Sequence, residues 1–381
     1  LFRITDFAEI GLNWDTVPYC RCPENIFPKY ELKENDILFA RIGATTGKSY
    51  IVKNPPRAVF ASYLIRLRPF SNVVPDYLYY FFNSDGYWNQ VNANKKNNLK
   101  GGVNSSTLSD IRFPLPSKEE QQKIAAILSK IQQTIEIQES IIEKTRELKK
   151  STLHYVFTQG LCGEKLKETE IGPMPESWEA ARVGKYCQKP EYGFTESAIA
   201  DGIGPKFLRI TDITENGVNW DTVPYCRCSQ NLFPKYELKE NDILFARIGA
   251  TTGKSHIVKN PPRAIFASYL IRLRPLYDVV PAYLYDFFNS EAYWNQVNAN
   301  KKNNLKGGVN SSFLSDIIFP LPSQSEQMEI ANIILTIDHK IEIYTAKKSA
   351  LQDLCKTMLS KLMTGEIRVK DLDINVSEVI A

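Results

Sequence analysis

Two short runs of the chain carry lysine or asparagine residues beside glycines, and each run recurs 206 residues later. The first run, G-A-T-T-G-K-S, covers Gly43–Ser49 and Gly249–Ser255. The second, N-K-K-N-N-L-K-G-G-V-N-S-S, begins at Asn94 and again at Asn300. Lysine neutralises phosphates, whereas arginine pairs with guanine edges and asparagine with adenine edges. These residue types indicate recognition of a nucleic acid rather than catalysis.

The run at Gly43 is similar to a phosphate-binding P-loop but departs from that pattern twice. Its spacer is one residue short, and the residues that follow it are strand-like. A P-loop instead leads into a helix whose N-terminus holds the phosphate. We interpret the run as a tight turn that presents Lys48 and backbone amides to a DNA phosphate, and we expect no nucleotide hydrolysis from it.

Two further motifs lack the partners that catalysis or metal binding requires. The N-P-P-R run at Asn54–Arg57 resembles the N-P-P-aromatic motif of amino-methyltransferases, but arginine replaces the aromatic residue on which a flipped base stacks. The C-x-C pairs that begin at Cys20 and Cys226 have no second ligand pair nearby, and a structural zinc needs four ligands. We therefore predict no methyl transfer by this chain, and packing roles for these cysteines.

The charges of the chain are segregated, although its net charge is only +4. The residues from Ile37 to Pro75 include six basic and no acidic side chains, and those from Gly86 to Ser109 include three basic and no acidic ones. Such segregation marks a surface for a polyanion, with a solvated basic face as the alternative. No apolar run reaches the roughly eighteen residues of a membrane span. The odd number of cysteines, seven, favours a reduced, cytoplasmic protein.

The predicted DNA-binding residues are basic and amide side chains from these segments in both copies. They are Arg41, Lys48, Arg57, Lys95, Lys96, Asn97, Asn98, Lys100, Arg247, Lys254, Arg263, Lys301, Lys302, Asn303, Asn304 and Lys306. A mobile surface loop is the alternative for the second run. Tyr50 and His256, the polar difference nearest the lysine of the first run, would set base preference in one half-site if they touch bases. No catalytic, metal or cofactor site is predicted.

These residues belong to a globular unit that the chain uses twice. Arg3–Ser117 aligns with Arg209–Ser323 without insertion or deletion, and eighteen of the 115 aligned positions differ. The unit is predicted to be α+β, because buried-strand patterns alternate with helical and turn patterns. Its predicted elements are strands at Asp36–Ile42 and Ser62–Leu67, hairpins and loops between them, a short helix at Pro75–Asn92, and a polar loop at Asn94–Ser106.

Each globular copy is followed by a stretch that predicts a long amphipathic helix, Ser117–Thr158 and Ser323–Thr364. Both open with an S-x-x-E capping box, completed by Glu120 or Glu326. A helix of this length spans about 60 Å and needs a partner of similar length to bury its apolar stripe. The predicted stripes include Ile124, Leu148, Tyr155, Ile330 and Leu354.

The predicted domain order follows from this duplication. It comprises a first recognition domain at 1–117, a helix at 118–158, a linker at 159–175, a second recognition domain at 176–323, a helix at 324–364 and a tail at 365–381. Because Leu1 aligns with Phe207, we expect about thirty to forty residues equivalent to those before Phe207 to be missing ahead of the first copy.

Several stretches together resemble the specificity (S) subunits of type I restriction-modification systems. They are I-G-P-M-P-E-S-W-E at 171–179, E-N-D-I-L-F-A-R-I-G-A-T-T-G-K-S at 34–49 and 240–255, F-P-L-P-S-x-x-E-Q at 113–121 and 319–327, and L-M-T-G-E-I-R-V at 362–369. The resemblance covers nearly the whole chain. The duplicated P-L-P-x-x-x-E-Q start of each long helix is its specific signature.

The resemblance implies two target-recognition domains that read the halves of a bipartite double-stranded DNA site. It implies that two long antiparallel helices, a coiled coil with pseudo-twofold symmetry, separate and join these domains and dock two methyltransferase subunits. Restriction/translocase subunits would complete the complex, and S-adenosylmethionine, ATP and Mg would bind to the partners rather than to this non-catalytic chain.

The resemblance is incomplete in one respect, because family members pair dissimilar recognition domains and this chain pairs near copies. We therefore expect it to read a near-palindromic site. The alternatives are a specificity subunit of a modification-only or type II-like system, and a free-standing DNA-binding regulator.

Overall fold

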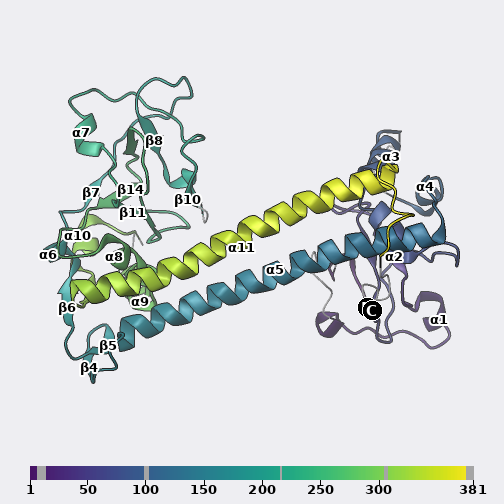
Figure 1. Ribbon diagram of the computed structural model, residues 1–381, viewed down its shortest axis with the longest axis horizontal. Helices are drawn as coiled ribbons and strands as arrows, with labels where there is room; N and C mark the ends of the chain where they lie inside the picture. Colours follow the sequence, from purple (N-terminus) through teal and green to yellow (C-terminus); the bar gives the residue numbers. More distant parts are fainter. Residues whose placement is uncertain (7–13, 98–102, 215–216, 304–307, 375–381) are drawn as a thin grey trace. The chain divides into compact units, whose positions relative to one another are not determined.

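The computed structural model describes residues 1–6, 14–97, 103–214, 217–303 and 308–374 (Figure 1). The chain falls into two compact units. Unit 1 comprises Leu1–Ile142 with Ile343–Ala381, and unit 2 comprises Glu143–Glu342. Each unit therefore holds one globular copy of the duplication together with one part of each long helix.

The globular part of unit 1 is built on a three-stranded antiparallel sheet of order β2–β1–β3. Its central strand β1 (Ile37–Ala40) is buried along its whole length, which agrees with its continuous apolar sequence. The flanking strands are β2 (Ser49–Ile51) and β3 (Leu64–Leu67). The other elements are η1 (Ile4–Asp6), η2 (Trp14–Thr16), α1 (Phe27–Tyr30), α2 (Pro75–Phe81), α3 (Asp85–Asn97) and α4 (Ser105–Ser109).

Unit 2 repeats this sheet and extends it by one strand. Its order is β12–β11–β14–β7, where β7 (Glu191–Tyr192) pairs antiparallel with β14 (Leu270–Leu273). The other two strands of this sheet are β11 (Ile243–Ala246) and β12 (Ser255–Ile257). Outside the sheet lie several strand pairs, among them the parallel pair β8 (Lys206–Leu208) and β13 (Ala264–Phe266), the pair β6 (Glu179–Arg182) and β15 (Ile318–Leu321), and the pair β9 (Ile213–Thr214) and β10 (Gly217–Val218). The helices are α6 (Val183–Tyr186), η3 (Ile210–Asp212), α7 (Phe233–Tyr236), α8 (Pro281–Phe287), α9 (Glu291–Asn303) and α10 (Ser311–Asp316).

Aromatic residues fill the space between sheet and helices in both units. Phe39 of β1 meets Phe82 edge-on with 4.7 Å between ring centroids, and Phe245 meets Phe288 in the same way. Such edge-to-face pairs add about 0.5–1.5 kcal/mol each beyond their burial. These aromatic side chains therefore belong to the core of each unit and not to an exposed base-stacking surface.

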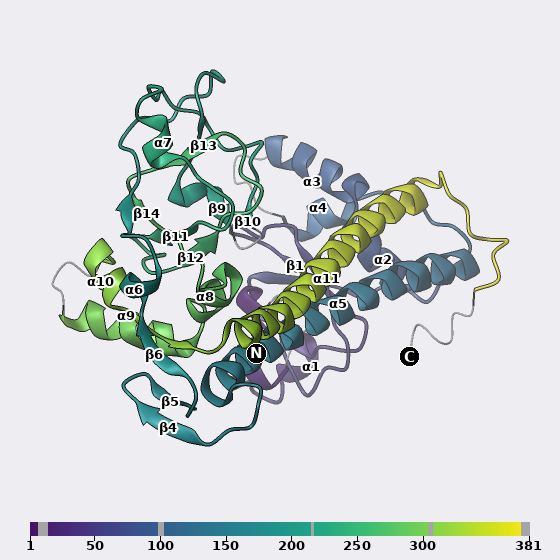
Figure 2. The same ribbon diagram turned by 60° about the vertical axis from the view of Figure 1, so that its left-hand side comes forward.

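Three local predictions are wrong. The predicted single helix at Pro75–Asn92 is two helices, α2 and α3, separated by a turn at Phe82–Ser84. The predicted loop from Asn94 begins too early, because α3 continues to Asn97 and α9 continues to Asn303. The predicted linker at 159–175 contains a hairpin of β4 (Leu166–Thr169) and β5 (Gly172–Pro175), visible in Figure 2.

The hairpin at the predicted linker is anchored in the core by Met174 of β5 and by Trp178, which follows the hairpin. Met174 is 1% exposed and Trp178 is 1% exposed, and both belong to the same hydrophobic cluster as Phe245 and Phe287. Burying a side chain of this size contributes about 1.5–3 kcal/mol. The hairpin is thus an integral part of unit 2.

Both long helices form close to their predicted bounds, as α5 (Lys118–Gln159) and α11 (Gln324–Thr364). In unit 1, Ile124 and Leu128 of α5 share a hydrophobic cluster with Leu362 and Met363 of α11. In unit 2, the end of α5 shares a cluster with the start of α11, where Phe157 joins Ile330. Within each unit the two helical parts therefore run antiparallel.

Part of each predicted apolar stripe lies on the surface instead. Leu148 and Tyr155 of α5 are 54% and 58% exposed, and Leu354 of α11 is 46% exposed. Apolar residues at spacings of three and four predict one apolar face of a helix, but they do not predict how much of that face the partner helix covers.

In the described residues, no helix is both long and apolar enough to span a membrane.

Candidate nucleic-acid interface

A tight turn joins the first two strands of each sheet and carries the predicted phosphate-binding lysine. Gly43 and Gly47 have φ values of +88° and +92°, and their counterparts Gly249 and Gly253 both have +90°. These left-handed conformations favour glycine, which has no Cβ. The turn leads into strands β2 and β12 rather than into a helix, so the rejection of a P-loop is confirmed.

The lysine at the end of this turn faces solvent in both units. Lys48 and Lys254 are exposed, and their backbone amides donate to the carbonyls of Thr45 and Thr251 at 2.9 Å. These hydrogen bonds fix the direction of the backbone at the lysine, and the ammonium group of the lysine lies in solvent. This is the placement that a contact to a DNA phosphate needs.

The end of α9 lies against the same turn in unit 2. Lys301 Nζ donates to the Thr252 carbonyl at 3.2 Å and lies 5.7 Å from the ring of Trp294. Val309 also lies beside the sheet, because its amide donates to the Arg247 carbonyl at 3.1 Å. Three of the predicted DNA-binding side chains, Arg247, Lys254 and Lys301, thus come from one region.

Two other contacts hold the turn and the helix in both units. Tyr87 Oη donates to the Gly47 carbonyl at 2.8 Å, as Tyr293 Oη donates to the Gly253 carbonyl at 2.7 Å. The Val103 amide donates to the Arg41 carbonyl at 3.2 Å, the counterpart of the Val309 contact. A side chain at Gly47 would meet Trp88 at 3.2 Å, so the turn is packed closely on α3. The two units therefore present the turn and the helix in the same arrangement.

Several predicted residues of the second run lie on helices rather than on a loop. Lys95, Lys96 and Asn97 are the last residues of α3, and Lys301, Lys302 and Asn303 are the last residues of α9. A polar run such as N-A-N-K-K-N has weak helical propensity, but the preceding helix extends through this run because helix formation is cooperative. Asn98, Lys100, Asn304 and Lys306 lie outside the described residues.

The arginine of the N-P-P-R turn differs between the units in its partner. Arg57 donates to both carboxylate oxygens of Glu24 at 2.7 Å, and its guanidinium lies 4.4 Å from the Phe27 ring centroid. Arg263 stacks on Phe233 at 4.5 Å, where residue 230 is glutamine instead of glutamate. The positive charge of Arg57 is therefore partly neutralised by Glu24 in unit 1, whereas the glutamine at the equivalent position in unit 2 leaves the charge of Arg263 in place.

The Tyr50/His256 difference lies at a partly buried position of each unit. Tyr50 is half-buried and packs on Phe2 with 5.3 Å between ring centroids. His256 is also half-buried, and desolvation by burial lowers its pKa to about 4. Both residues are therefore partly buried in their units, and the hypothesis that they read bases stays a prediction.

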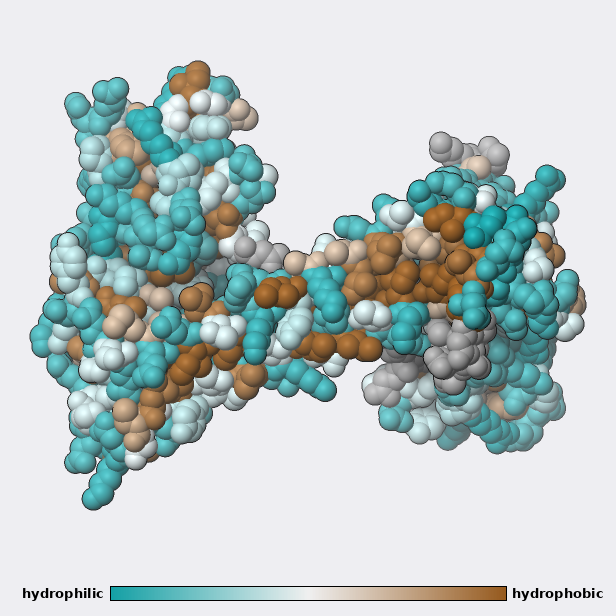
Figure 3. Space-filling view, viewed as in Figure 1, coloured by the Kyte–Doolittle hydropathy of each residue, from teal (hydrophilic) through white to brown (hydrophobic). Residues whose placement is uncertain are grey.

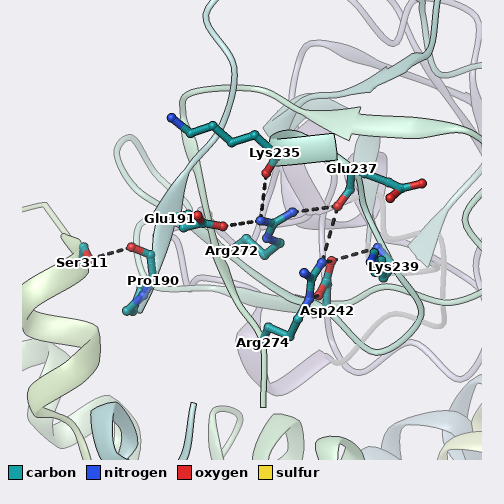
Figure 4. A network of polar contacts seen from close by, with 9 residues as sticks. All are labelled: Pro190, Glu191, Lys235, Glu237, Lys239, Asp242, Arg272, Arg274 and Ser311. Atoms are coloured by element: carbon teal, nitrogen blue, oxygen red, sulfur yellow. Dashed lines mark hydrogen bonds and ion pairs between the residues drawn. The ribbon is translucent and has the colours of Figure 1, made fainter. Parts of the chain in front are cut away.

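An arginine network that the sequence patterns did not single out organises the edge of the sheet in unit 2 (Figure 4). Arg272 of β14 is 4% exposed and binds the Glu191 carboxylate of β7, the Glu237 carbonyl at 2.7 Å and the Lys235 carbonyl at 3.0 Å. Arg274 pairs with Asp242, which is 1% exposed, at 2.6 Å. The only sequence signal was the alternation of arginine with apolar residues in L-I-R-L-R, which places both arginines on one face.

The described residues contain no group of three histidine, cysteine, aspartate or glutamate side chains arranged to hold a metal ion. Of the C-x-C cysteines, Cys226 is fully buried in a hydrophobic cluster, but Cys20 is exposed. The predicted packing role is therefore right for Cys226 and wrong for Cys20.

Comparison with known proteins gives a consistent result. Residues 23–146 and 175–353 match the family model described as the type I restriction modification DNA specificity domain. The chain is 27% identical over 357 residues to the type I restriction enzyme MjaVIII specificity subunit of Methanocaldococcus jannaschii, a match that covers 90% of this chain and 81% of that protein. It is 21% identical to the type I restriction enzyme EcoKI specificity subunit of Escherichia coli K12, covering 93% and 80%.

A solved structure has a similar fold. The S subunit of a type I restriction-modification system from M. genitalium matches with a TM-score of 0.56 at 17% identity, over 88% of this chain and 84% of that one.

Proposed function

Because the chain belongs to the family of type I restriction-modification DNA specificity domains, we propose that it reads DNA for such a system and holds its catalytic subunits. The proposal rests on the pair of equivalent basic regions, each made of an exposed lysine turn and the end of a helix. Lysine and arginine at such places neutralise DNA phosphates, and these contacts set the register of the protein on the duplex.

The two globular copies would read two half-sites of the same or nearly the same sequence. The backbone of the lysine turn and its contact with the neighbouring helix recur in both units, and the residues from Asn92 to Ser106 equal those from Asn298 to Ser312. Two equivalent readers related by a pseudo-twofold axis recognise an interrupted palindrome. The half-site centres would lie about one helical turn, or about 34–36 Å, apart if both bind the same face of DNA.

The long helices would form one antiparallel coiled coil that spaces the recognition domains and docks two methyltransferase subunits. Supporting this proposal, large apolar side chains lie exposed along both helices, and Figure 3 shows hydrophobic residues on their visible face. The exposed residues include Ile137, Leu148 and Tyr155 on α5, and Met328, Leu335, Ile343 and Leu354 on α11. Apolar residues concentrated on a surface mark interaction sites.

Catalysis would reside in the partners. Methyl transfer would need S-adenosylmethionine in the methyltransferase, and cleavage would need ATP and Mg in the restriction/translocase subunit. The chain would read the DNA sequence and set the spacing of the complex. A cytoplasmic location follows only from this proposed role.

The decisive experiment is to express the chain with a methyltransferase partner in a host without other modification systems and to sequence the methylated motifs. We expect an interrupted motif with matching or near-matching halves. Two unrelated half-sites would contradict equivalent reading. To distinguish a specificity subunit from a free-standing regulator, the chain is purified alone and together with the partner. Methylation that depends on the presence of the partner identifies a specificity subunit.

A further inference from the structure

A five-residue turn, K-N-P-P-R, carries two cations in each unit. It covers Lys53–Arg57 in unit 1 and Lys259–Arg263 in unit 2, with the same sequence in both. Its asparagine has a left-handed backbone in each copy, with φ of +47° at Asn54 and +45° at Asn260. The turn is therefore alike in sequence and in backbone conformation.

A neutral side chain holds the lysine of this turn in the same way in both units. Lys53 Nζ donates to Asn35 Oδ1 at 2.8 Å, and Lys259 Nζ donates to Asn241 Oδ1 at 2.7 Å. Because the asparagine is uncharged, this contact orients the ammonium group without neutralising it.

An aromatic ring holds the arginine of the turn in both units. The guanidinium of Arg57 lies 4.4 Å from the Phe27 ring centroid. The guanidinium of Arg263 lies 4.5 Å from the ring centroid of Phe233, the first residue of α7 (Figure 1). Stacking of this kind covers one face of the guanidinium and leaves the N–H groups at its edge for an anion.

In unit 1, each cation of the turn pairs with a carboxylate. Lys53 Nζ lies 2.9 Å from Asp76 Oδ1. Arg57 Nη2 donates to both carboxylate oxygens of Glu24 at 2.7 Å. Because the guanidinium group binds carboxylates and phosphates alike, Glu24 occupies the edge of Arg57 at which a phosphate would bind.

Unit 2 has neither of these two carboxylates. Ala282 aligns with Asp76, and Gln230 aligns with Glu24. The aligned copies differ at eighteen positions, and these two differences each remove an acid that pairs with the same turn in unit 1. The turn itself is unchanged, so the copies differ in the counter-ions of the turn.

One carboxylate remains beside the turn of unit 2. Glu240 Oε1 lies 3.6 Å from Lys259 Nζ, and Glu240 Oε2 accepts from the Asn260 amide at 2.6 Å. Its counterpart Glu34 accepts from the Asn54 amide in unit 1, also at 2.6 Å. Among the described residues, three carboxylates therefore contact the turn and its two cations in unit 1, whereas one carboxylate does so in unit 2.

We propose that the Lys259–Arg263 turn binds a phosphate of duplex DNA, and that Asp76 and Glu24 keep the equivalent turn of unit 1 from doing so. The side chain of Lys259 is 54% exposed, and Arg263 is exposed, so both cations are accessible to the DNA backbone. This inference rests on the proposed reading of DNA. Because phosphate contacts carry no sequence information, the two units read the same bases but bind their half-sites with unequal strength.

The test measures binding of the full chain to duplex DNA over a range of salt concentrations. The double variant Gln230→Glu with Ala282→Asp gives unit 2 the acids of unit 1. It should weaken binding and flatten the slope of log K against log salt concentration by up to about 1.8, equivalent to about two phosphates. An unchanged affinity and slope would overturn the proposal.

The reciprocal double variant, Glu24→Gln with Asp76→Ala, removes the acids that pair with the turn of unit 1. It should strengthen binding and steepen the salt dependence by a similar amount. Each substitution introduces the residue that the other copy has at the aligned position, so we expect both double variants to fold. An unchanged or flatter slope would refute the role given to the two carboxylates.

The control is Lys340→Gln with Lys347→Gln, at exposed positions of α11, which changes the net charge by the same two units as the first variant. Its slope should equal that of the wild type, and an equal flattening would assign the effect to total charge. If the wild-type chain binds no duplex DNA, the proposed function fails and this inference fails with it. Wild-type binding with equal slopes in both double variants contradicts only the inference.

Discussion

Arg368 donates two hydrogen bonds of 2.7 Å to the carboxylate of Glu120, and so ties the segment after α11 to the first turn of α5 within unit 1. The Val369 amide also donates to this carboxylate, at 3.4 Å. The capping-box pattern predicts that the Glu120 side chain accepts a hydrogen bond from the backbone at the start of its own helix. Ser117 Oγ does accept from the Glu120 amide at 3.3 Å, but the Glu120 side chain binds the other helix's tail instead.

Glu326 is used in the same way in unit 2. Its carboxylate accepts from the Leu161 amide at 3.1 Å and from Trp178 Nε1 at 3.0 Å. In each unit, the glutamate at the start of one long helix therefore receives the chain that follows the other. This explains why the S-x-x-E motif recurs although much of the helix sequence differs.

The first prediction concerns this glutamate. Arg368→Ala should lower the melting temperature of the chain at pH 7, because it leaves the buried carboxylate of Glu120 without its charged partner. Arg368 holds the pKa of Glu120 below its ordinary value of 4.5, so the stabilisation is present above pH 4.5 and is lost as the pH falls further. Thermal unfolding of both proteins at several pH values measures the difference.

A matched control for this experiment is Lys361→Ala. Lys361 pairs with Glu366 at 2.8 Å, but both side chains are exposed, and such surface pairs contribute little. Equal losses for the two variants would contradict a specific role for Arg368.

The second prediction concerns the lysines near the end of α3. Replacing Lys95, Lys96 and Lys100 by alanine should weaken binding to all DNA sequences alike. It should reduce the salt dependence of binding by up to about three phosphate equivalents, because each neutralised phosphate releases counterions. Binding to duplexes of different sequence is measured over a range of salt concentrations.

The control changes the net charge by the same amount elsewhere. Lys130, Lys144 and Lys150 are exposed on α5, and their replacement by alanine should leave the salt dependence unchanged. If both triple variants flatten the slope equally, the effect is one of total charge and not of a binding surface.

The duplication and both long helices were predictable from the sequence because each depends on a regular pattern. The ends of α3 and α9 were missed because helices extend by cooperativity beyond the residues that favour them. The site around Arg272 was missed for a different reason. Its partner Glu191 lies 81 residues away, and no local pattern links two residues that only the sheet brings together.

The third prediction concerns Asp286, which stands where unit 1 has Tyr80. Burial raises the pKa of this carboxyl well above 3.8, with Lys149 opposing the rise and Asp338 adding to it. The folded state therefore holds the proton more tightly than the unfolded state, and stability falls as the pH rises above about 4. Asp286→Asn should raise the melting temperature at pH 7.5, and the gain should shrink as the pH approaches 4.

The control for Asp286 is an exposed aspartate of the same unit. Asp316 lies 3.6 Å from Arg182 with its side chain 66% exposed, so Asp316→Asn should change stability little at any pH. A pH-independent gain in Asp286→Asn would show that packing, rather than ionisation, causes the effect.

The fourth prediction concerns His256, whose pKa burial lowers to about 4 from an ordinary value of 6.5. Below pH 6.5 the unfolded chain takes up a proton that folded His256 does not, so this residue destabilises the protein progressively between pH 6.5 and 4. His256→Tyr introduces the residue that unit 1 has at this place, Tyr50, and should flatten the fall of melting temperature over that range. His339→Tyr, at an exposed position of α11, should leave the fall unchanged. Melting curves of the three proteins from pH 7.5 to 4.5 decide the matter, since parallel curves would mean that His256 takes up its proton equally well in the folded state.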